Sequence, residues 1–522
     1  MDFTKMVHSF LEDSARRFPG KNALFAFGNW HKYQELDDQA NRLARFLLKQ
    51  GLAKGDRVGL FIENSAEYVI SYYGILKAGG TTVALNTEST AEDVAYVMGD
   101  CGIRYLVASQ KLLARLLVVP EGRLNCPSLD RSGSLKGVLA WAPPGSSLPD
   151  ATGVPIACLP DACRAESSEG PGVRTIDLDI ASIVYTSRST GKPRGAVLSH
   201  LNIVANTRSI VEYLRLTPED RVMVVLPFYY IYGKSLLNTH FAVAGSVVVD
   251  NRFLYPNVIL QTMQEQEVTG FAGVPSTFTI LLGRSNVRSR KFPKLRYLTQ
   301  AGGAMAPSVQ KDVAETFAPA RLFIMYGATE ASARLSYLAP EDLPRKWGSI
   351  GKAIPNVDVF VAGENGGPLP AGEEGEIVAR GSNIMSGYWN HPEETAKVLR
   401  NGLYYTGDIG RADEDGFLYV VGRTKDMIKI GGNRVSAKEI EEALHEHPAV
   451  AEAAVIGVPD MVLGEAPKAF VVLKDPFGKE ILEQLPGFLQ GHLALYKIPK
   501  LYEIRDSLPK TESGKILKQK LR

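Results

Sequence analysis

The sequence is poor in several features, and each absence excludes a class of protein. Only 4 of its 522 residues are cysteine, at Cys101, Cys126, Cys158 and Cys163. They form no CxxC pair and have no histidine nearby at zinc spacing, so we expect reduced thiols in a cytoplasmic protein and no cysteine-bound metal. No apolar run approaches the roughly 18 residues of a membrane span, and the first residues lack a signal-peptide core. We therefore expect a soluble protein without a membrane span.

An excess of charge of either sign is also missing. The chain has 59 Lys and Arg against 57 Asp and Glu, a net charge of +2, and no long block of like charge. Nothing in this pattern favours an extended nucleic-acid surface, so any contact with phosphate must be local.

What the sequence does have is length and a regular alternation of element types. A chain of 522 residues exceeds what one core normally serves, and its 45% hydrophobic content can fill at least two. Apolar runs at 57–62 and 82–85 flank a helical pattern at 66–77, which predicts a βαβ unit with parallel strands. From 350 onward the pattern changes to short strands and turns, and a small α+β segment begins near Lys425. We predict an α/β fold, with doubly wound sheets and a small β-region in residues 1–424 and an α+β domain in residues 425–522.

One segment stands out chemically. Residues 183–200 read Ile-Val-Tyr-Thr-Ser-Arg-Ser-Thr-Gly-Lys-Pro-Arg-Gly-Ala-Val-Leu-Ser-His. We interpret them as a strand, a flexible loop and the start of a helix, with backbone N–H groups, hydroxyls and cations suited to a polyphosphate. It is not a Walker A loop, because Lys192 is followed by Pro193 in place of Ser or Thr. An ordinary solvated turn is the alternative, and the segment alone does not decide between them.

Four further segments follow in a fixed order: 326–330 (Tyr-Gly-Ala-Thr-Glu), 405–408 (Tyr-Thr-Gly-Asp), 422–426 (Gly-Arg-Thr-Lys-Asp) and 508–515 (Leu-Pro-Lys-Thr-Glu-Ser-Gly-Lys). With these five segments the chain resembles the adenylate-forming superfamily, which contains acyl- and aryl-CoA synthetases, carrier-protein adenylation domains and beetle luciferases. The resemblance extends over nearly all of the chain, and the AMP-forming acyl- and aryl-CoA synthetases fit best.

The resemblance implies a two-step reaction. A small carboxylic acid attacks the α-phosphate of ATP, with Mg²⁺, to give an acyl-adenylate and pyrophosphate; coenzyme A, or the phosphopantetheine of an acyl carrier protein, then displaces AMP. A luciferase-like oxygenase and a catalytically weak nucleotide-binding sensor are the other readings that stay open.

The resemblance also assigns roles to residues. Lys515, Thr329 and Glu330 would be catalytic, with Glu330 also the ligand of Mg²⁺. ATP would be bound by Thr186, Ser187, Ser189, Thr190, Gly191, Lys192, Gly302, Gly303, Ala304, Tyr326, Gly327, Asp408 and Arg423. The small domain would be mobile, turning about Lys425 and presenting Gly431 and Gly432 to the CoA arm. Taken singly, Glu330 is better interpreted as an exposed helix start and Asp408 as part of a turn, and core packing explains Tyr326 nearly as well.

Two positions depart from the family pattern: Arg188 stands where a glycine is usual and Arg194 where a lysine is usual. Arg188 either adds a cation for the triphosphate or hampers a loop that needs glycine's freedom.

The acid is expected beside Tyr230, Tyr232 and Lys234, where aromatic side chains suit an apolar or aromatic acid. Core packing is the alternative for the tyrosines, and Lys234 either pairs with a second polar group of the substrate or points to solvent. No Asp stands in the pattern that holds an α-ammonium group, so an α-amino acid is disfavoured.

Overall fold

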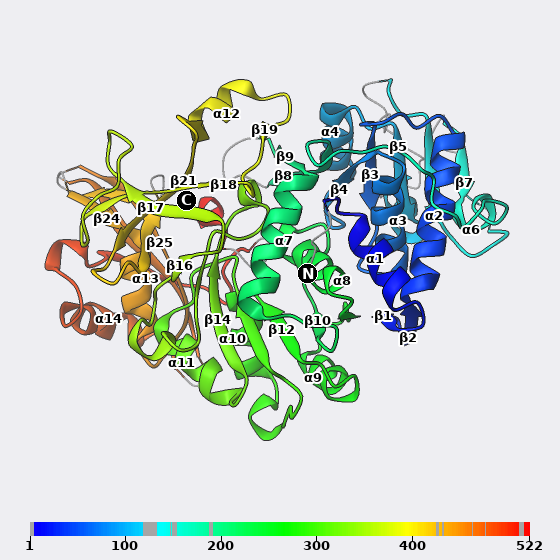
Figure 1. Ribbon diagram of the computed structural model, residues 1–522. Helices are drawn as coiled ribbons and strands as arrows, with labels where there is room; N and C mark the ends of the chain where they lie inside the picture. The colour runs from blue at the N-terminus through cyan, green and yellow to red at the C-terminus, as the bar shows by residue number, and fades with distance from the viewer. Residues whose placement is uncertain are drawn as a thin grey trace.

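The computed structural model describes residues 5–117, 133–146, 148, 154–186, 192–423, 427–430, 433–461, 463–474, 477–510 and 516–521. The strands among these residues form four sheets. Figure 1 shows the chain running from the first sheet through a central layer of strands and helices to a C-terminal unit at the other end of the molecule. The predicted α/β class is confirmed.

The first sheet contains the strands on either side of the expected phosphate loop. Its strand order is β19 (Gly387–Tyr388), β9 (Arg194–Ser199), β8 (Ile180–Thr186), β4 (Thr81–Ala84), β3 (Arg57–Phe61), β5 (Tyr105–Ser109), β6 (Gly137–Trp141) and β7 (Ile156–Cys158). The helices of this part are α2 (Tyr33–Lys49), α3 (Ala66–Lys77), α4 (Ala91–Cys101), α5 (Gln110–Leu117) and α6 (Leu159–Ala162). β3 and β4 are parallel and flank α3, as the pattern predicts.

The second sheet forms the centre of the molecule. Its order is β16 (Lys352–Ala353), β15 (Ser336–Leu338), β14 (Arg321–Tyr326), β13 (Tyr297–Gln300), β12 (Gly270–Gly273), β10 (Arg221–Val224), β11 (Ser246–Val249), β1 (Asn22–Ala26) and β2 (Asn29–Lys32). Its helices are α1 (Ser9–Arg17), α7 (His200–Leu214), α8 (Ile231–Ala242), α9 (Pro256–Glu265), α10 (Pro275–Arg284) and α11 (Pro307–Thr316).

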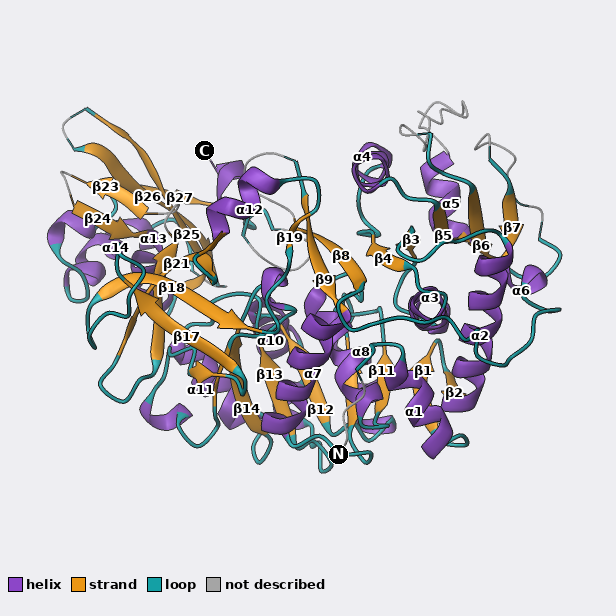
Figure 2. Cartoon of the chain, turned by 45° about the horizontal axis from the view of Figure 1, so that its top comes forward, coloured by secondary structure: helices purple, strands orange, loops and turns teal. Residues whose placement is uncertain are grey.

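Helix α8 lies inside the molecule. Every residue from Ile231 to Phe241 is buried. Both sheets contribute to the core cluster around it, and α7 and α1 pack against it. A helix that is buried all round joins the two large sheets into one scaffold. Figure 2 shows α7 and α8 among the strands at this centre.

Two smaller sheets complete the fold. The third is antiparallel and contains β17 (Val357–Ala362), β18 (Glu374–Gly381), β21 (Leu403–Ala412), β20 (Leu399–Arg400) and β22 (Leu418–Arg423), with helix α12 (Pro392–Val398) nearby. The fourth contains β23 (Met427–Ile430), β24 (Asn433–Ser436), β25 (Val450–Asp460), β26 (Gly464–Leu473) and β27 (Leu501–Ile504), with helices α13 (Ala437–His445) and α14 (Ile481–Gln490).

The fourth sheet has its own core and touches the rest of the chain at β22. Its core cluster draws on residues from Ile428 to Leu489. The Ser436 hydroxyl donates to the Val421 carbonyl, and the Lys438 ammonium donates to that of Val420. The expected boundary at Lys425 falls between β22 and β23, and Lys425 itself lies outside the described residues.

The structure corrects two expectations. After the phosphate loop the chain does not enter a helix directly: β9 first pairs antiparallel with β8, Val184 facing Ala196, and α7 begins only at His200. The apolar run at 196–198 completes a buried hairpin, which outweighs its local helical pattern. The stretch 143–172, whose Pro, Gly and Ser content indicates an irregular surface loop, contains β7 and α6.

Cys101, Cys158 and Cys163 are free thiols. Among the described helices none is both long and apolar enough to cross a membrane.

Candidate active site

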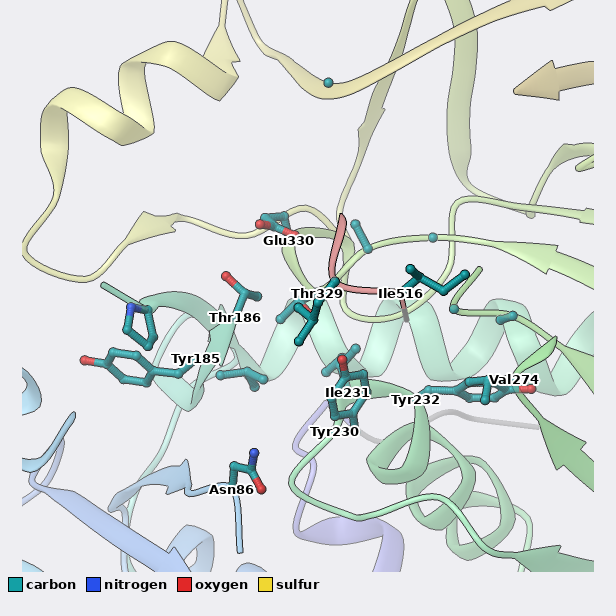
Figure 3. A pocket seen from close by; sticks show the side chains of 18 of the residues that line it. Asn86, Tyr185, Thr186, Tyr230, Ile231, Tyr232, Val274, Thr329, Glu330 and Ile516 are labelled. Carbon is teal, nitrogen blue, oxygen red and sulfur yellow. The ribbon is translucent and has the colours of Figure 1, made fainter. Parts of the chain in front are cut away.

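A cavity of about 1530 Å³ lies where the large sheets meet the C-terminal unit. Thr186 at the end of β8, the loop after β14, residues 404–408 of β21 and residues 516–519 all line it. Figure 3 shows Thr186, Thr329 and Glu330 on one side of this space and Tyr230 and Tyr232 on the other. Parallel α/β sheets place ligand sites at the carboxyl ends of their strands, which is where Thr186 and the loop after β14 stand.

Thr186 and Lys192 stand on either side of the expected phosphate loop. Thr186 lines the cavity, and its hydroxyl donates to the Arg194 carbonyl at 3.4 Å. Lys192 is exposed, with its ammonium 4.9 Å from the Tyr96 ring centre beside a smaller hollow. The expected phosphate ligands Ser187, Ser189, Thr190 and Gly191, and the departure at Arg188, lie outside the described residues.

The loop after β14 brings Thr329 and Glu330 to the cavity. The Tyr388 hydroxyl donates to Glu330 Oε1 at 2.6 Å, which orients the carboxylate. Gly327 permits the tight fold of this loop, because a β-carbon there would come 2.0 Å from the Ala333 carbonyl oxygen. The glycine is thus required by backbone packing as well as by its place on the cavity wall.

Asp408 is the polar centre of the same wall. It is 5% exposed, and each of its oxygens accepts a hydrogen bond. Tyr326 Oη donates to Oδ2 at 2.6 Å, and Arg423 Nε donates to Oδ1 at 2.8 Å. Burial, reinforced by the negative charge of Asp408, raises the pKa of Tyr326 well above its ordinary value. The phenol therefore stays protonated and remains a donor to the carboxylate.

The expected adenine segment is only partly at the cavity. Gly302 lines it, with a positive φ of +85° that favours glycine. Gly303 and Ala304 are exposed and, like the Tyr326 ring, are not on its described lining.

Aromatic and aliphatic side chains line the other part of the cavity. Tyr230, Tyr232, Val274, Phe253 and Ile280 are among them. The Tyr232 hydroxyl donates a hydrogen bond to the Thr299 carbonyl at 2.9 Å, which fixes the side chain. A mostly apolar wall with few polar groups is typical of a pocket for a small organic ligand.

Lys234 does not line this pocket, and it does not point to solvent either. The Lys234 side chain leaves α8 into the buried core, with Nζ 3.1 Å from Ser182 Oγ and 5.4 Å from the Tyr72 ring centre. Desolvation lowers the pKa of Lys234 to about 7. Lys234 follows Tyr230 by four residues, about 6 Å further along the helix axis, where α8 is surrounded by the core.

Arg334 is a cavity residue that the motifs did not indicate. It lines the same cavity, is 3% exposed, and its guanidinium carbon lies 4.0 Å from the Tyr232 ring centre. The only signal in the sequence is its position a few residues after Glu330, among small residues.

The C-terminal unit closes one side of the cavity. Lys510, Ile516 and Lys518 line it, and Figure 3 shows Ile516 beside Thr329 in that view. Lys515, Gly431 and Gly432 lie outside the described residues. The described part of the chain contains no cluster of three or more His, Cys, Asp or Glu side chains that would hold a metal by itself.

The cavity combines hydroxyl and carboxylate groups with aromatic side chains, which suits a polar nucleotide beside an organic acid. Comparison with known proteins agrees. The family described as AMP-binding enzyme matches residues 11–389, and the AMP-binding enzyme C-terminal domain matches residues 439–515.

Relatives match over nearly the whole chain. A long-chain-fatty-acid–CoA ligase of Bacillus subtilis is 35% identical, covering 99% of this chain and 94% of its own length. A feruloyl-CoA synthase of Amycolatopsis is 33% identical, covering 97% and 96%. The crystal structure of the anthranilate CoA ligase AuaEII with anthranoyl-AMP superposes with a TM-score of 0.88 at 27% identity, covering 100% of this chain and 97% of that one.

The chain belongs to the AMP-binding enzyme family. Within it, the chain is an AMP-forming acid–CoA ligase, which activates a carboxylic acid with ATP as an acyl-adenylate and transfers the acyl group to coenzyme A.

Proposed function

We propose that the single cavity holds ATP and an apolar or aromatic carboxylic acid together, and that free coenzyme A accepts the acyl group. The observation that carries this proposal is the continuity of the cavity. Its polar wall at Thr329 and Asp408 and its aromatic wall at Tyr230 and Tyr232 enclose one space. An acid in the aromatic part would thus present its carboxylate to the α-phosphate without crossing solvent, which is the positional advantage such a reaction needs.

Asp408 and Arg423 would bind the ribose. A buried carboxylate is a strong acceptor for two neighbouring hydroxyls, and Arg423, whose Nε donates to Oδ1 at 2.8 Å, holds it in place. Tyr326 would fix the carboxylate through its hydroxyl. Gly302, Gly303, Ala304 and Gly327 would complete the adenine wall.

The phosphates would lie between Thr186 and Thr329. Thr329 would donate to the α-phosphate, where negative charge accumulates in the transition state. The β- and γ-phosphates would be held by Thr186, Ser187, Ser189, Thr190, Gly191 and Lys192.

Glu330 fits a magnesium ligand. It offers a carboxylate at the cavity, and the Tyr388 hydroxyl engages one of its oxygens. Mg²⁺ is commonly held by one or two carboxylates together with substrate phosphates and water, so a lone Glu330 suffices. When bound, the ion would neutralise negative charge on the phosphates. The hydrogen bond from Tyr388 would hold the Glu330 carboxylate in the orientation that the ion needs.

The acid would lie against Tyr230, Tyr232 and Val274. Burial of an apolar body there contributes about 25 cal/mol for each Å² removed from water, which favours fatty and aryl acids over small polar ones. The pattern that would hold an α-ammonium group is missing from the sequence, so α-amino acids should be poor substrates.

Lys515 would be the catalytic lysine of the first half-reaction. Ile516, its neighbour in sequence, lines the cavity beside the Thr329 wall, which supports this role. A cation between two reacting anions lowers the barrier to their approach.

We propose that residues 425–522 then turn about Lys425 relative to residues 1–424 and bring Gly431 and Gly432 to the CoA arm. The small contact of Ser436 and Lys438 with β22 is compatible with such a turn.

A direct experiment measures pyrophosphate release from ATP and Mg²⁺ across fatty, aryl and dicarboxylic acids, each with and without free CoA. We expect acid-dependent pyrophosphate in both arms and thioester only with CoA. If pyrophosphate is released but no thioester forms with free CoA, and a thioester does form when an acyl carrier protein is added, the carrier-protein alternative is favoured. ATP binding without pyrophosphate for any acid would favour the sensor alternative and refute the proposal.

A further inference from the structure

The Arg334 side chain is a buried cation on the wall of the acid pocket. It is 3% exposed and lines the cavity together with Tyr232 and Ala333. Within the described part of the chain, no carboxylate forms an ion pair with it. Burying a guanidinium without a counter-charge is costly, so a sequence that retains one in a ligand pocket is expected to gain from it when the ligand is bound.

The groups around the guanidinium are weak or neutral. Nη1 donates to the Ala333 carbonyl at 2.9 Å, and Nε lies 3.3 Å from the thioether sulfur of Met325, a weak acceptor. The phenols of Tyr213 and Tyr232 also face it: burial raises the pKa of both, and the Arg334 charge opposes that rise. Both phenols are therefore neutral at physiological pH and supply no counter-charge.

The backbone fixes where the side chain starts. The side-chain amides of Asn206 and Asn383 both donate to the Arg334 carbonyl, at 2.9 and 2.8 Å. Asn206 comes from α7 and Asn383 from the loop after β18, so two elements hold this one residue. The face of the guanidinium stacks on Tyr232, with 4.0 Å between its carbon and the ring centre. Stacking occupies a face of the planar group and leaves N–H donors at its edge for a planar anion.

We propose that Arg334 is a specificity-determining residue, and that the acid taken by this enzyme carries a second carboxylate that pairs with the Arg334 guanidinium. This inference rests on the proposed function and narrows it from apolar acids to acids with an apolar body and two acidic groups. Lys234, which the sequence suggested for such pairing, is turned into the core.

The test compares matched acids that differ only in the distal group: α,ω-dicarboxylic acids against monocarboxylic acids of the same chain length, and 4-carboxycinnamate against 4-methylcinnamate. The measured quantity is the ratio of kcat/KM for the diacid to that for the monoacid, from pyrophosphate release. Wild type, Arg334→Met, Arg334→Lys and, as a matched buried cation outside the cavity, Lys234→Met are compared.

We expect wild type to prefer the diacid in at least one pair. In Arg334→Met the ratio should fall at least about tenfold, equivalent to about 1.4 kcal/mol. Arg334→Lys should be intermediate because it keeps the charge but loses the planar fork, and Lys234→Met should keep the wild-type ratio. Acid-induced increases of the melting temperature, with a non-hydrolysable ATP analogue present, should follow the same order.

Other outcomes refute the inference in distinguishable ways. A wild-type preference for monoacids shows that no second carboxylate is recognised. An equal loss for both acids of a pair means that Arg334 binds the reacting carboxylate or only supports the fold, and Arg334→Lys keeps the comparison possible if Arg334→Met does not fold. Absence of pyrophosphate with every acid refutes the proposed function itself.

Discussion

The buried ammonium of Lys234 gives a quantitative prediction. Its surroundings in α8 lower its pKa to about 7 from the ordinary 10.5. The Lys234 ammonium donates to Ser182 Oγ, which also accepts from the Thr82 hydroxyl and donates to the Thr82 carbonyl. Replacing Lys234 by Met preserves the approximate volume and leaves Ser182 hydrogen-bonded, so neither a cavity nor an unsatisfied hydroxyl follows.

The shifted pKa of Lys234 makes the free energy of unfolding depend on pH. The folded pKa lies below the unfolded one, so the unfolded chain binds more protons between about pH 7 and 10.5, and wild-type stability rises with pH through this range. Below the folded pKa the charged lysine imposes its full penalty, and above the unfolded pKa it imposes none. At about 1.4 kcal/mol for each pH unit, the gap sets an upper limit of about 5 kcal/mol. Lys234→Met should therefore be more stable than wild type at pH 7, by several kcal/mol at most, and the difference should vanish above about pH 10.5.

Urea denaturation of both proteins at neutral and alkaline pH, followed by circular dichroism, measures this difference. Lys77→Met is the matched control, since Lys77 is equally buried but its Nζ lies 2.6 Å from Asp37 and 3.2 Å from Glu12. Removing that lysine leaves the buried Asp37 without a cation beside it and should destabilise the protein by about 3 kcal/mol or more. A Lys234→Met protein that is less stable at pH 7, or a difference that does not change with pH, would refute the reasoning.

Further predictions concern the reaction. Glu330→Gln should raise the Mg²⁺ concentration needed for half-maximal rate, because the amide keeps the shape but loses the charge; an unchanged Mg²⁺ titration would contradict the metal role. Asp408→Asn should raise the KM for ATP by about tenfold or more while leaving that for the acid, since it loses a charged acceptor; equal changes in both would point to a structural role. Arg188→Gly should leave the adenylation rate unchanged or higher, and a fall beyond about tenfold would make Arg188 a phosphate ligand. Lys515→Ala should stop pyrophosphate release but still convert pre-made acyl-adenylate to thioester, whereas Lys425→Pro should release pyrophosphate and stall; loss of the same half-reaction in both would exclude the two-conformation mechanism.

Local patterns predict local structure well here. Helix α3 runs from Ala66 to Lys77 as its periodicity indicates, and Ser436 caps α13 by accepting from the Glu439 amide. Both depend on neighbours within a few residues. The motif residues Thr186, Thr329 and Asp408 do line one cavity, where the end of β8, the loop after β14 and the middle of β21, from three different sheets, meet.

The remainder depends on contacts that are distant in sequence. The burial of Lys234 follows from packing between two sheets, and its nearest polar partner, Ser182, is 52 residues away. Arg334 takes its place from Asn206 and Asn383, 128 and 49 residues distant. Neither lysine nor arginine signals by its own neighbourhood that it is buried, so the sequence could not distinguish a solvent-exposed cation from a pocket cation.

The most direct test of the central claim uses the wild-type protein in two stages. Enzyme is first mixed with ATP, Mg²⁺ and its best acid without CoA, and nucleotides and bound products are measured; CoA is then added. We predict pyrophosphate and enzyme-bound acyl-adenylate in equal amounts in the first stage, then AMP and acyl-CoA in the same amounts in the second. Formation of ADP and phosphate, or pyrophosphate release that does not depend on the acid, would contradict it.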